Sequence, residues 1–263
     1  MIEKQRLIKS LDLNMIESGV FWGKSTGSNV VELDPIVCIS TEVPIPELNW
    51  VFSTRPSRER IKPLVKETIS YYEAVKKPFV WWVLENNLTE ELKQLFEENN
   101  MHVKLASSAM GFNLENDIGD IAIDDDLIIK RVSTKKELDD FGEASYKGFE
   151  IDTKYEYLFK NFVQKMRYDS PKQELFVGYY KNRPQCTGLL FIEGGVAGLY
   201  WISTAPDCRK KGYGFSLTTY MLKHIKKRGL KTAVLESSEM GINLYRKIGF
   251  EELNKVYLYS LKN

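Results

Sequence analysis

The sequence predicts an α/β protein built from two domains of the same fold, and three observations support this prediction. Short apolar runs typical of strands alternate along the chain with longer stretches of helical period. The chain has 263 residues, which is a comfortable length for two domains of ordinary size. Short motifs of the first half recur in the second half.

The first half begins with a helix and continues with strands and helices. The run from Pro78 to Leu84 is apolar and aromatic throughout, which is typical of a buried strand. Thr89 precedes a stretch of helical period, and a threonine there can cap the first turn. The expected elements are a helix over Glu3–Met15, strands over Ile36–Ser40 and Trp50–Ser53, a helix over Glu59–Val75, a strand over Pro78–Leu84 and a helix from Thr89 to Glu98.

A polar segment then separates the two halves. Residues Glu115 to Asp126 are rich in Asp and Asn and have no apolar period, as is typical of a linker. We expect a first domain over residues 1–118, a linker over 119–126 and a second domain over 127–263. The second domain is expected to contain strands over Leu127–Val132, Leu175–Tyr180, Cys186–Glu193, Val196–Ser203, Thr232–Glu236 and Val256–Leu261, and helices over Lys135–Ser145, Lys154–Met166, Phe215–Lys227 and Gly241–Ile248.

The two halves repeat short motifs at nearly the same offset. The motif Phe52–Pro56 resembles Ile202–Pro206, at an offset of 203 − 53 = 150. The pair Leu95–Phe96 resembles Leu244–Tyr245, at an offset of 245 − 96 = 149. Between these motifs both halves have an amphipathic helix followed by a hydrophobic strand, so the sequence predicts a shared fold.

Charge and hydropathy exclude several classes of protein. Lys and Arg number 37 and Asp and Glu number 36, so the formal net charge of +1 gives no reason to expect nucleic acid as a partner. No apolar run approaches the ~20 residues of a membrane-spanning helix, and the amino terminus has no apolar core of signal-peptide type. We therefore expect a cytoplasmic protein that has no membrane partner.

The cysteines and histidines predict no metal site. The sequence has three cysteines and two histidines, and the cysteines are scattered without metal-ligand spacing. We expect the cysteines to be small buried apolar residues in a reducing compartment. These residues are Cys38, Cys186, Cys208, His102 and His224.

The segment that most favours ligand binding lies between a strand and a helix of the second half. Residues Arg209 to Gly214 follow the strand that ends near Thr204, and a helix comes next. The first amides of a helix point at one spot, and the helix dipole adds partial positive charge there. Gly212 and Gly214 lack a Cβ atom, so the backbone can approach phosphate oxygens closely. The basic residues 209–211 supply neutralising charge, although an ordinary turn with a solvated basic cluster is the alternative.

A second glycine-containing segment resembles a nucleotide-binding P-loop and is rejected. The run Gly23–Thr26 has the Gly-Lys-Ser-Thr order of such a loop, but the preceding glycine is Gly19. Three residues separate the two glycines where four are needed, and the segment before them has helical rather than strand character.

The loop at 209–214 resembles the Arg/Gln-x-x-Gly-x-Gly/Ala loop of the GCN5-related N-acetyltransferase (GNAT) family. Further along, Leu235–Ser238 and Leu244–Phe250 resemble the second signature of that family, a strand, a short helix with Leu-Tyr, and a Gly-Phe turn. The resemblance covers about Leu127 to Leu261. It implies two GNAT-like domains, each a central mixed, mostly antiparallel sheet flanked by helices, with acetyl-CoA as co-substrate and no metal.

The resemblance also implies site residues. The family often has Asn and Ala before the Leu-Tyr pair, where this sequence has Ser238 and Gly241, and a serine can still hydrogen-bond to the cofactor. The cofactor is expected on the end of the strand, the loop, the first turn of the helix and one serine: Ile202, Ser203, Thr204, Arg209, Lys210, Lys211, Gly212, Tyr213, Gly214, Phe215 and Ser238.

The chemistry implied by the family is direct attack of a neutral amine on the acetyl thioester, with CoA thiolate as the leaving group. Tyr245 matches the tyrosine of the family whose hydroxyl faces the CoA sulfur, so it is the expected catalytic residue. Deprotonating a lysine-like amine at pH 7 costs roughly 4–5 kcal/mol, so a base or a water chain is needed. Glu236 and Glu193 are the candidate bases, and each has the alternative interpretation of a solvated carboxylate.

The first half is expected to have lost the cofactor chemistry. Phe96 takes the place of Tyr245, and Lys62-Pro63-Leu64 is matched to the Gly-x-Gly stretch, which removes both glycines and one backbone N–H. The acceptor stays open between small-molecule amines and protein amines, and homodimerisation is also left open. The competing interpretation of the whole chain is a non-catalytic module that binds acyl-CoA or another protein.

Overall fold

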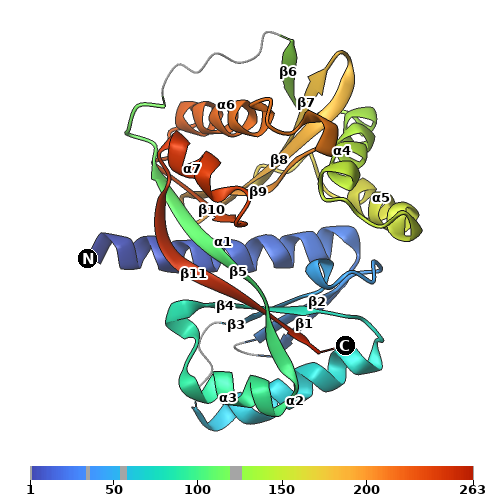
Figure 1. Ribbon diagram of the computed structural model, residues 1–263, viewed down its shortest axis with the longest axis vertical. Helices are drawn as coiled ribbons and strands as arrows, with labels where there is room; N and C mark the ends of the chain where they lie inside the picture. The colour runs from blue at the N-terminus through green and yellow to red at the C-terminus, as the bar shows by residue number, and fades with distance from the viewer. Residues whose placement is uncertain (1, 34–35, 54–57, 119–125, 263) are drawn as a thin grey trace.

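The computed structural model describes residues 2–33, 36–53, 58–118 and 126–262 (Figure 1). Its strands form one continuous sheet in the order β1-β2-β3-β4-β11-β5-β10-β9-β8-β7-β6. The strands are β1 (Asn29–Leu33), β2 (Ile36–Ser40), β3 (Trp50–Ser53), β4 (Val80–Leu84), β5 (Met101–Asn113), β6 (Leu127–Arg131), β7 (Gln173–Tyr180), β8 (Arg183–Glu193), β9 (Val196–Thr204), β10 (Thr232–Ser237) and β11 (Glu251–Leu261). The α-helices are α1 (Ile2–Thr26), α2 (Arg58–Ala74), α3 (Glu90–Glu98), α4 (Lys135–Gly148), α5 (Glu156–Gln164), α6 (Tyr213–Lys227) and α7 (Ile242–Ile248).

Each half gives its last strand to the sheet of the other half. Strands β3 and β4 run parallel in the first half, as β9 and β10 do in the second. Strand β11 pairs antiparallel with β4, and β5 pairs antiparallel with β10. The two exchanged strands also pair with each other, and both cross the middle of the molecule in Figure 1. The halves are therefore joined by strand exchange as well as by the chain between them.

Helix α1 lies between the two halves (Figure 1) and packs on both of them. Its contacts with the second half are polar as well as apolar. The Asn14 Nδ2 atom donates to the carbonyl oxygens of Phe191 and Val196, at 3.3 and 3.1 Å. The indole N–H of Trp22 donates to Gln173 Oε1 at 2.6 Å. This helix of the first half thus packs directly against the sheet of the second half.

Two apolar cores cover opposite faces of the second half. Helices α6 and α7 pack on one face, in a core that includes Leu235 of β10. Helices α1, α4 and α5 contribute to the other core, which includes Val234. Because side chains alternate along a strand, Glu236 points to the same face as Val234, the face on which α1 lies.

Local sequence signals explain several helix ends. Thr89 caps α3 by accepting a hydrogen bond from the Leu92 amide at 3.1 Å, as the sequence predicts. Helix α4 begins with a capping box between Thr134 and Glu137. Helix α7 ends at Gly249, whose φ of 110° is a backbone conformation that favours glycine.

The structure confirms the α/β class and nearly all the predicted elements, with shifts of a few residues at their ends. Helix α1 extends to Thr26, well beyond Met15, and Gly23 lies within it, which confirms the rejection of a P-loop. Strands β1 and β5 were not predicted. The expected linker over residues 119–126 lies outside the described residues except for Asp126, and the domain boundaries stay a prediction.

One correspondence between the halves was wrong in register. Residues 62–64 were matched to the glycines at the start of α6, but they lie inside α2, which begins at Arg58. The chain immediately before α2 is residues 54–57, which lie outside the described residues.

Candidate active site

Strands β9 and β10 separate part of the way along their length. Their parallel pairing runs from Val196 and Thr232 to Leu199 and Leu235. Beyond this point β9 continues to Thr204 and β10 continues to Ser237 without pairing to each other. The edge of β9 that faces β10 is therefore open over its last five residues, and its backbone groups there are not used by the sheet ladder.

A bulge in β9 lies at this opening. Thr187 of β8 is opposite Ser203 and Leu189 is opposite Tyr200, so Trp201 and Ile202 together face one residue of β8. Trp201 has a φ of 52°, which is uncommon for a residue other than glycine. The bulge changes the direction of the backbone where the two parallel strands part.

The start of α6 follows β9 across a short turn and has the geometry expected of an anion site. Gly212 is the N-cap residue with a φ of 85°, and a Cβ atom built on it would meet nothing within 4 Å. A Cβ atom on Gly214 would lie 3.5 Å from Thr204 Oγ1, so the end of β9 adjoins the first turn of the helix. The first helical hydrogen bond here runs from the Ser216 amide to Gly212 O, which leaves the Gly214 and Phe215 amides ahead of it.

The three basic residues of the loop differ in their surroundings. The Arg209 guanidinium donates to the carbonyl oxygens of Thr204 and Gly148, at 3.2 and 2.9 Å, and pairs with Glu150 at 2.8 Å. It therefore ties the end of α4 to the loop. Lys210 and Lys211 are exposed.

The other residues expected to contact a cofactor lie around the same opening. Ser203 is buried and its hydroxyl is 2.8 Å from Thr187 Oγ1, so this side chain is used within the sheet. Tyr213 is buried, with its ring 5.5 Å from that of Tyr180. Ile202, Thr204 and Phe215 are half-buried, and Ser238 is exposed in the turn after β10.

Tyr245 lies on α7 beside the end of β10. A Cβ atom on Gly241 would be 3.0 Å from the Tyr245 ring and 3.2 Å from Ser237 Oγ, so ring and strand end adjoin. The side chain is 7% exposed, and burial raises the pKa of its hydroxyl well above the usual range. The hydroxyl is therefore protonated at neutral pH and remains a hydrogen-bond donor. Within the described part of the chain, no hydrogen bond involves it.

The structure separates the two candidate bases. Glu236 is half-buried at the end of β10, and burial raises the pKa of its carboxyl to about 8, an effect that a hydrogen bond with Ser107 partly offsets. Glu193 lies at the opposite end of β9, in the hairpin with Val196, and pairs with Lys172 at 2.6 Å. Of the two carboxyl groups, the one of Glu236 lies beside the strand opening.

Sequence reasoning did not find the partners of Glu236 that come from the first half. Ser107 belongs to β5, which lies alongside β10 with Ala109 opposite Glu236. Tyr200 of β9 adjoins Glu236 and donates its hydroxyl to Asn14 Oδ1 of α1 at 2.8 Å. A scan for motifs has no signal for such contacts, because they depend on the exchanged strand and on α1.

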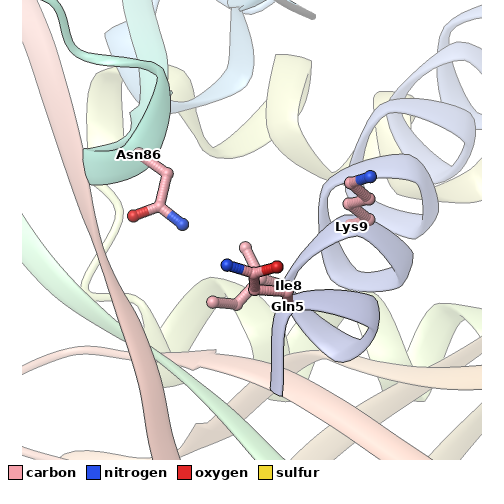
Figure 2. Close-up of a pocket in the computed structure, with 4 residues that line it drawn as sticks. All are labelled: Gln5, Ile8, Lys9 and Asn86. Atoms are coloured by element: carbon pink, nitrogen blue, oxygen red, sulfur yellow. The ribbon is translucent and has the colours of Figure 1, made fainter. Parts of the chain in front are cut away.

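The first half has a pocket of about 220 Å³, which Figure 2 shows between α1 and the turn after β4. Asn86 lines it from the turn, and the α1 residues that line it are Gln5, Ile8 and Lys9. At the repeat offset of 149 or 150, Glu236 falls on Asn87 or Asn86. These asparagines lie in the turn after β4 and not in the strand, so the offset does not hold at this position.

Phe96 is the structural counterpart of Tyr245. Each lies four residues before a residue of positive φ that follows its helix, Asn100 in one half and Gly249 in the other. The Phe96 ring is fully buried, 5.1 Å from the ring of Trp81 and 4.4 Å from that of Tyr259. The first half keeps the fold at this position without the hydroxyl.

Within the described ranges, no group of three or more His, Cys, Asp or Glu side chains is placed to hold a metal ion. In the same part of the chain, no helix is both long enough and apolar enough to cross a membrane. All three cysteines are buried and free.

The parallel strand pair opens toward a glycine-containing helix start, and a protonated tyrosine and a carboxyl of raised pKa lie nearby. Such an arrangement can accommodate an elongated anionic ligand and transfer protons. Residues 138–250 match the model of the acetyltransferase (GNAT) family. This part of the chain is therefore similar to that family.

Similar proteins agree in fold. The chain is 30% identical over 132 residues to an uncharacterized N-acetyltransferase of Methanocaldococcus jannaschii, and the match spans 45% of this chain and 58% of that relative. A GCN5-related N-acetyltransferase from Kribbella flavida is similar in structure, with a TM-score of 0.72, 14% identity and 95% of each chain covered. A tandem GNAT protein from the clavulanic acid biosynthesis pathway has a TM-score of 0.60 and 10% identity, with 86% of this chain and 77% of that chain covered. The α/β fold of the chain is thus shared with solved proteins, one of which is described as a tandem GNAT protein.

Proposed function

We propose that the protein is an acyltransferase of EC class 2.3.1 that transfers the acetyl group of acetyl-CoA to a primary amine. The observation that most supports this proposal is the opening between β9 and β10, which leads from the Gly212 helix start to Tyr245 and Glu236. The match of residues 138–250 to the model of the acetyltransferase (GNAT) family supports the same reaction.

The residues present fit a pyrophosphate at the start of α6. Space is open beside Gly212, and the Gly214 and Phe215 amides precede the first helical hydrogen bond. We assign the neutralising charge to Lys210 and Lys211, because Arg209 is engaged with protein partners. The open edge of β9 over Ile202–Thr204 would hydrogen-bond to the pantetheine arm. Acetyl-CoA supplies the activated acetyl group.

Two side chains would move protons in this reaction. Glu236 accepts a proton from the amine. Its raised pKa of about 8 lies close to neutral pH, and a general base is most effective when its pKa is near the working pH. Tyr245 donates a hydrogen bond to the leaving sulfur, because its hydroxyl stays protonated. The pantetheine arm and the acceptor would approach from opposite faces, because Leu235 and Glu236 point to opposite sides of β10.

Release of free thiol from acetyl-CoA, measured in the presence of a library of primary amines, tests the proposal. The library includes small amines, amino acids and peptides that carry a lysine or a free amino terminus. We expect thiol release with at least one acceptor class, and its loss in Glu236→Gln. If acetyl-CoA binds and no amine causes thiol release, the proposed reaction is wrong and the chain is a binding module.

A further inference from the structure

The peptide between Trp201 and Ile202 lies where the two parallel strands part. The pairing of β9 with β10 ends at Leu199, and the bulge of β9 follows almost directly. Trp201 has a φ of 52°, which is an unfavourable backbone conformation for a residue with a Cβ atom. Such a residue persists only where its surroundings hold it in place. The contacts of Trp201 therefore determine the shape of β9 at the opening.

A buried hydroxyl of β8 binds the backbone of this bulge. The Thr187 hydroxyl donates to the carbonyl oxygen of Trp201 at 2.9 Å. Its oxygen accepts from the Ser145 hydroxyl of α4 at 3.3 Å and lies 2.8 Å from Ser203 Oγ. Because Thr187 has one hydroxyl hydrogen and gives it to Trp201, Ser203 is the donor in the last contact. All three hydroxyl-bearing residues are buried, so water has little access to this network.

Aromatic residues hold the side chain of Trp201. Its ring is stacked with that of Phe162 of α5, with a distance of 6.3 Å between ring centroids. The ring of Phe159, also of α5, lies 5.9 Å away, and that of Trp22 of α1 lies 6.3 Å away. The aromatic rings thus fix the side chain, whereas the Thr187 hydroxyl fixes the carbonyl group of the same residue.

The orientation of this peptide determines which group faces the opening. In a trans peptide, the carbonyl and the following N–H point in opposite directions. Because the Trp201 carbonyl points to Thr187 of β8, the Ile202 N–H points away from β8, toward the side on which β9 is unpaired. A ligand with its phosphates at the start of α6 passes Thr204 first and reaches Ile202 last along the open edge of β9. The thioester end of acetyl-CoA would therefore lie beside the Ile202 N–H.

We propose that Thr187 is a positioning residue for acetyl transfer, whose hydroxyl holds the Trp201 carbonyl and thereby directs the Ile202 N–H at the acetyl carbonyl oxygen. This inference rests on the proposed function, because acetyl-CoA is the ligand. Negative charge develops on the acetyl oxygen when the amine attacks, and an N–H that is already aimed at this oxygen stabilises the charge. Thr187 acts through the peptide and does not touch the reacting atoms.

The test compares variants that remove or keep this hydroxyl. Thr187→Val removes the hydroxyl and nearly keeps the size of the side chain, and Thr187→Ser keeps the hydroxyl as the conservative rescue. Thr26→Val is the matched control. Thr26 is also buried, and its hydroxyl donates to the carbonyl oxygen of Trp22 at 2.8 Å, at the end of α1. Both valine variants therefore lose a buried hydroxyl-to-carbonyl hydrogen bond, but only one of these bonds holds the bulge of β9.

Infrared spectroscopy of bound acetyl-CoA, labelled with ¹³C at the acetyl carbonyl and without an amine, measures the proposed contact. A hydrogen bond to the carbonyl oxygen lowers the stretching frequency, so we expect the frequency in the parent protein to lie below that of free acetyl-CoA. In Thr187→Val it should return toward the free value, and in Thr187→Ser and Thr26→Val it should stay at the parent value.

Calorimetry gives a second readout, because CoA lacks the acetyl oxygen. Thr187→Val is expected to weaken acetyl-CoA binding by about three- to tenfold and CoA binding by less than about twofold, as the loss of one hydrogen bond predicts. An unmoved carbonyl frequency in folded Thr187→Val overturns the proposal. Equal weakening of acetyl-CoA and CoA also overturns it, since a purely structural change in the opening affects both ligands.

The two proposals can fail separately. If the frequency returns toward the free value in Thr187→Val but the parent protein acetylates no amine, Thr187 orients the peptide and the proposed function is wrong. If the parent acetylates an amine and the frequency does not move in Thr187→Val, the function stands and Thr187 has a structural role only. If Thr187→Val does not fold, Thr187→Ala removes the same hydroxyl, and the same results are expected and decide in the same way.

Discussion

At the scale of single residues, Gly212 is the position where one added atom has the clearest expected effect. Its φ of 85° favours glycine, and no protein atom lies within 4 Å of the place where a Cβ atom would be. Both properties allow the backbone to approach a phosphate closely. Gly212→Val is expected to raise the apparent dissociation constant of acetyl-CoA at least tenfold, because the added side chain occupies the phosphate position. The fold is expected to be kept. Calorimetric titration with acetyl-CoA measures this change.

Gly229 offers a matched control for that substitution. It has a φ of 79° and equally open surroundings, but it follows the other end of α6. Gly229→Val imposes the same backbone strain, roughly 1–2 kcal/mol, far from the proposed site. We expect it to lower stability as Gly212→Val does and to leave acetyl-CoA affinity unchanged. Equal affinity in both variants would show that the loop does not bind the phosphates.

Tyr245 tests the proton donor. Tyr245→Phe keeps the ring and its 5.8 Å contact with Phe250, so stability should change little. Loss of the hydroxyl is expected to lower turnover at least tenfold with nearly unchanged acetyl-CoA affinity, since general-acid catalysis is typically worth a hundredfold or more. Steady-state rates with the best acceptor decide it. Unchanged turnover would assign Tyr245 a packing role only.

Glu236 should also affect the pH dependence of folding stability. Its pKa of about 8 in the folded protein lies above the ordinary value of 4.5, so the folded state binds the proton more tightly than the unfolded state. The stability from this group is fully present below pH 4.5 and is lost as pH rises toward 8 and beyond. We expect Glu236→Gln to gain stability relative to the parent between pH 5 and pH 9, by about 2 kcal/mol after allowance for solvent screening. Urea unfolding of both proteins at pH 5, 7 and 9 measures the difference.

At the scale of elements, the sequence signals that succeeded were local. Helical period and the Thr89 cap predicted α2 and α3 well, because these signals arise within the element itself. Strand β5 was missed because residues 103–106 are exposed and residues 107–112 are buried, so its 13 residues have no alternating pattern. Such a strand is specified by its neighbours, β10 and β11, which lie far away in sequence.

The parts of the candidate site that lie in short contiguous motifs could be predicted from the sequence, and the parts that the fold brings together could not. The turn from β9 into α6 and the Tyr245 helix are short contiguous motifs, and the structure places them next to each other. The contact of Asn14 with Tyr200 could not be predicted, because it depends on the packing of α1 against the second half. The alternative bases also needed the structure, since Glu236 lies beside the strand opening and Glu193 lies at the opposite end of β9, paired with Lys172.

The loop before α6 gives a prediction about two kinds of basic residue. Arg209 connects the ends of α4 and β9 through two carbonyl oxygens, whereas Lys211 is exposed. Arg209→Gln should lower the free energy of unfolding by about 1–2 kcal/mol, the usual effect of losing hydrogen bonds from a charged group. Lys211→Gln should leave stability unchanged and weaken acetyl-CoA binding, more so at low salt. The opposite pattern in urea unfolding and calorimetry would reverse the two assignments.

At the scale of the whole molecule, the exchanged strands make each half depend on the other. Without β5, the edge of β10 lacks its antiparallel partner, and without β11 the same holds for β4. An unpaired edge of this kind exposes backbone groups and apolar surface. The two halves are therefore expected to fold together, and the first half is expected to be needed because it completes the sheet of the second half.

The last prediction concerns stoichiometry and fragments. The full chain should bind one acetyl-CoA, in the second half, because Gly212 and Tyr245 have no equivalents among the described residues of the first half. Residues 1–118 alone and 126–263 alone should bind none, since each lacks the strand that the other supplies. The two fragments mixed after co-expression should recover one site per pair, because β5 and β11 can be exchanged between separate chains. Calorimetry of the full chain, each fragment and the pair measures these numbers. Two equivalent sites on the full chain, or a site on residues 1–118 alone, would contradict the assignment of a single site, and binding by residues 126–263 alone would show that β5 is dispensable for the cofactor.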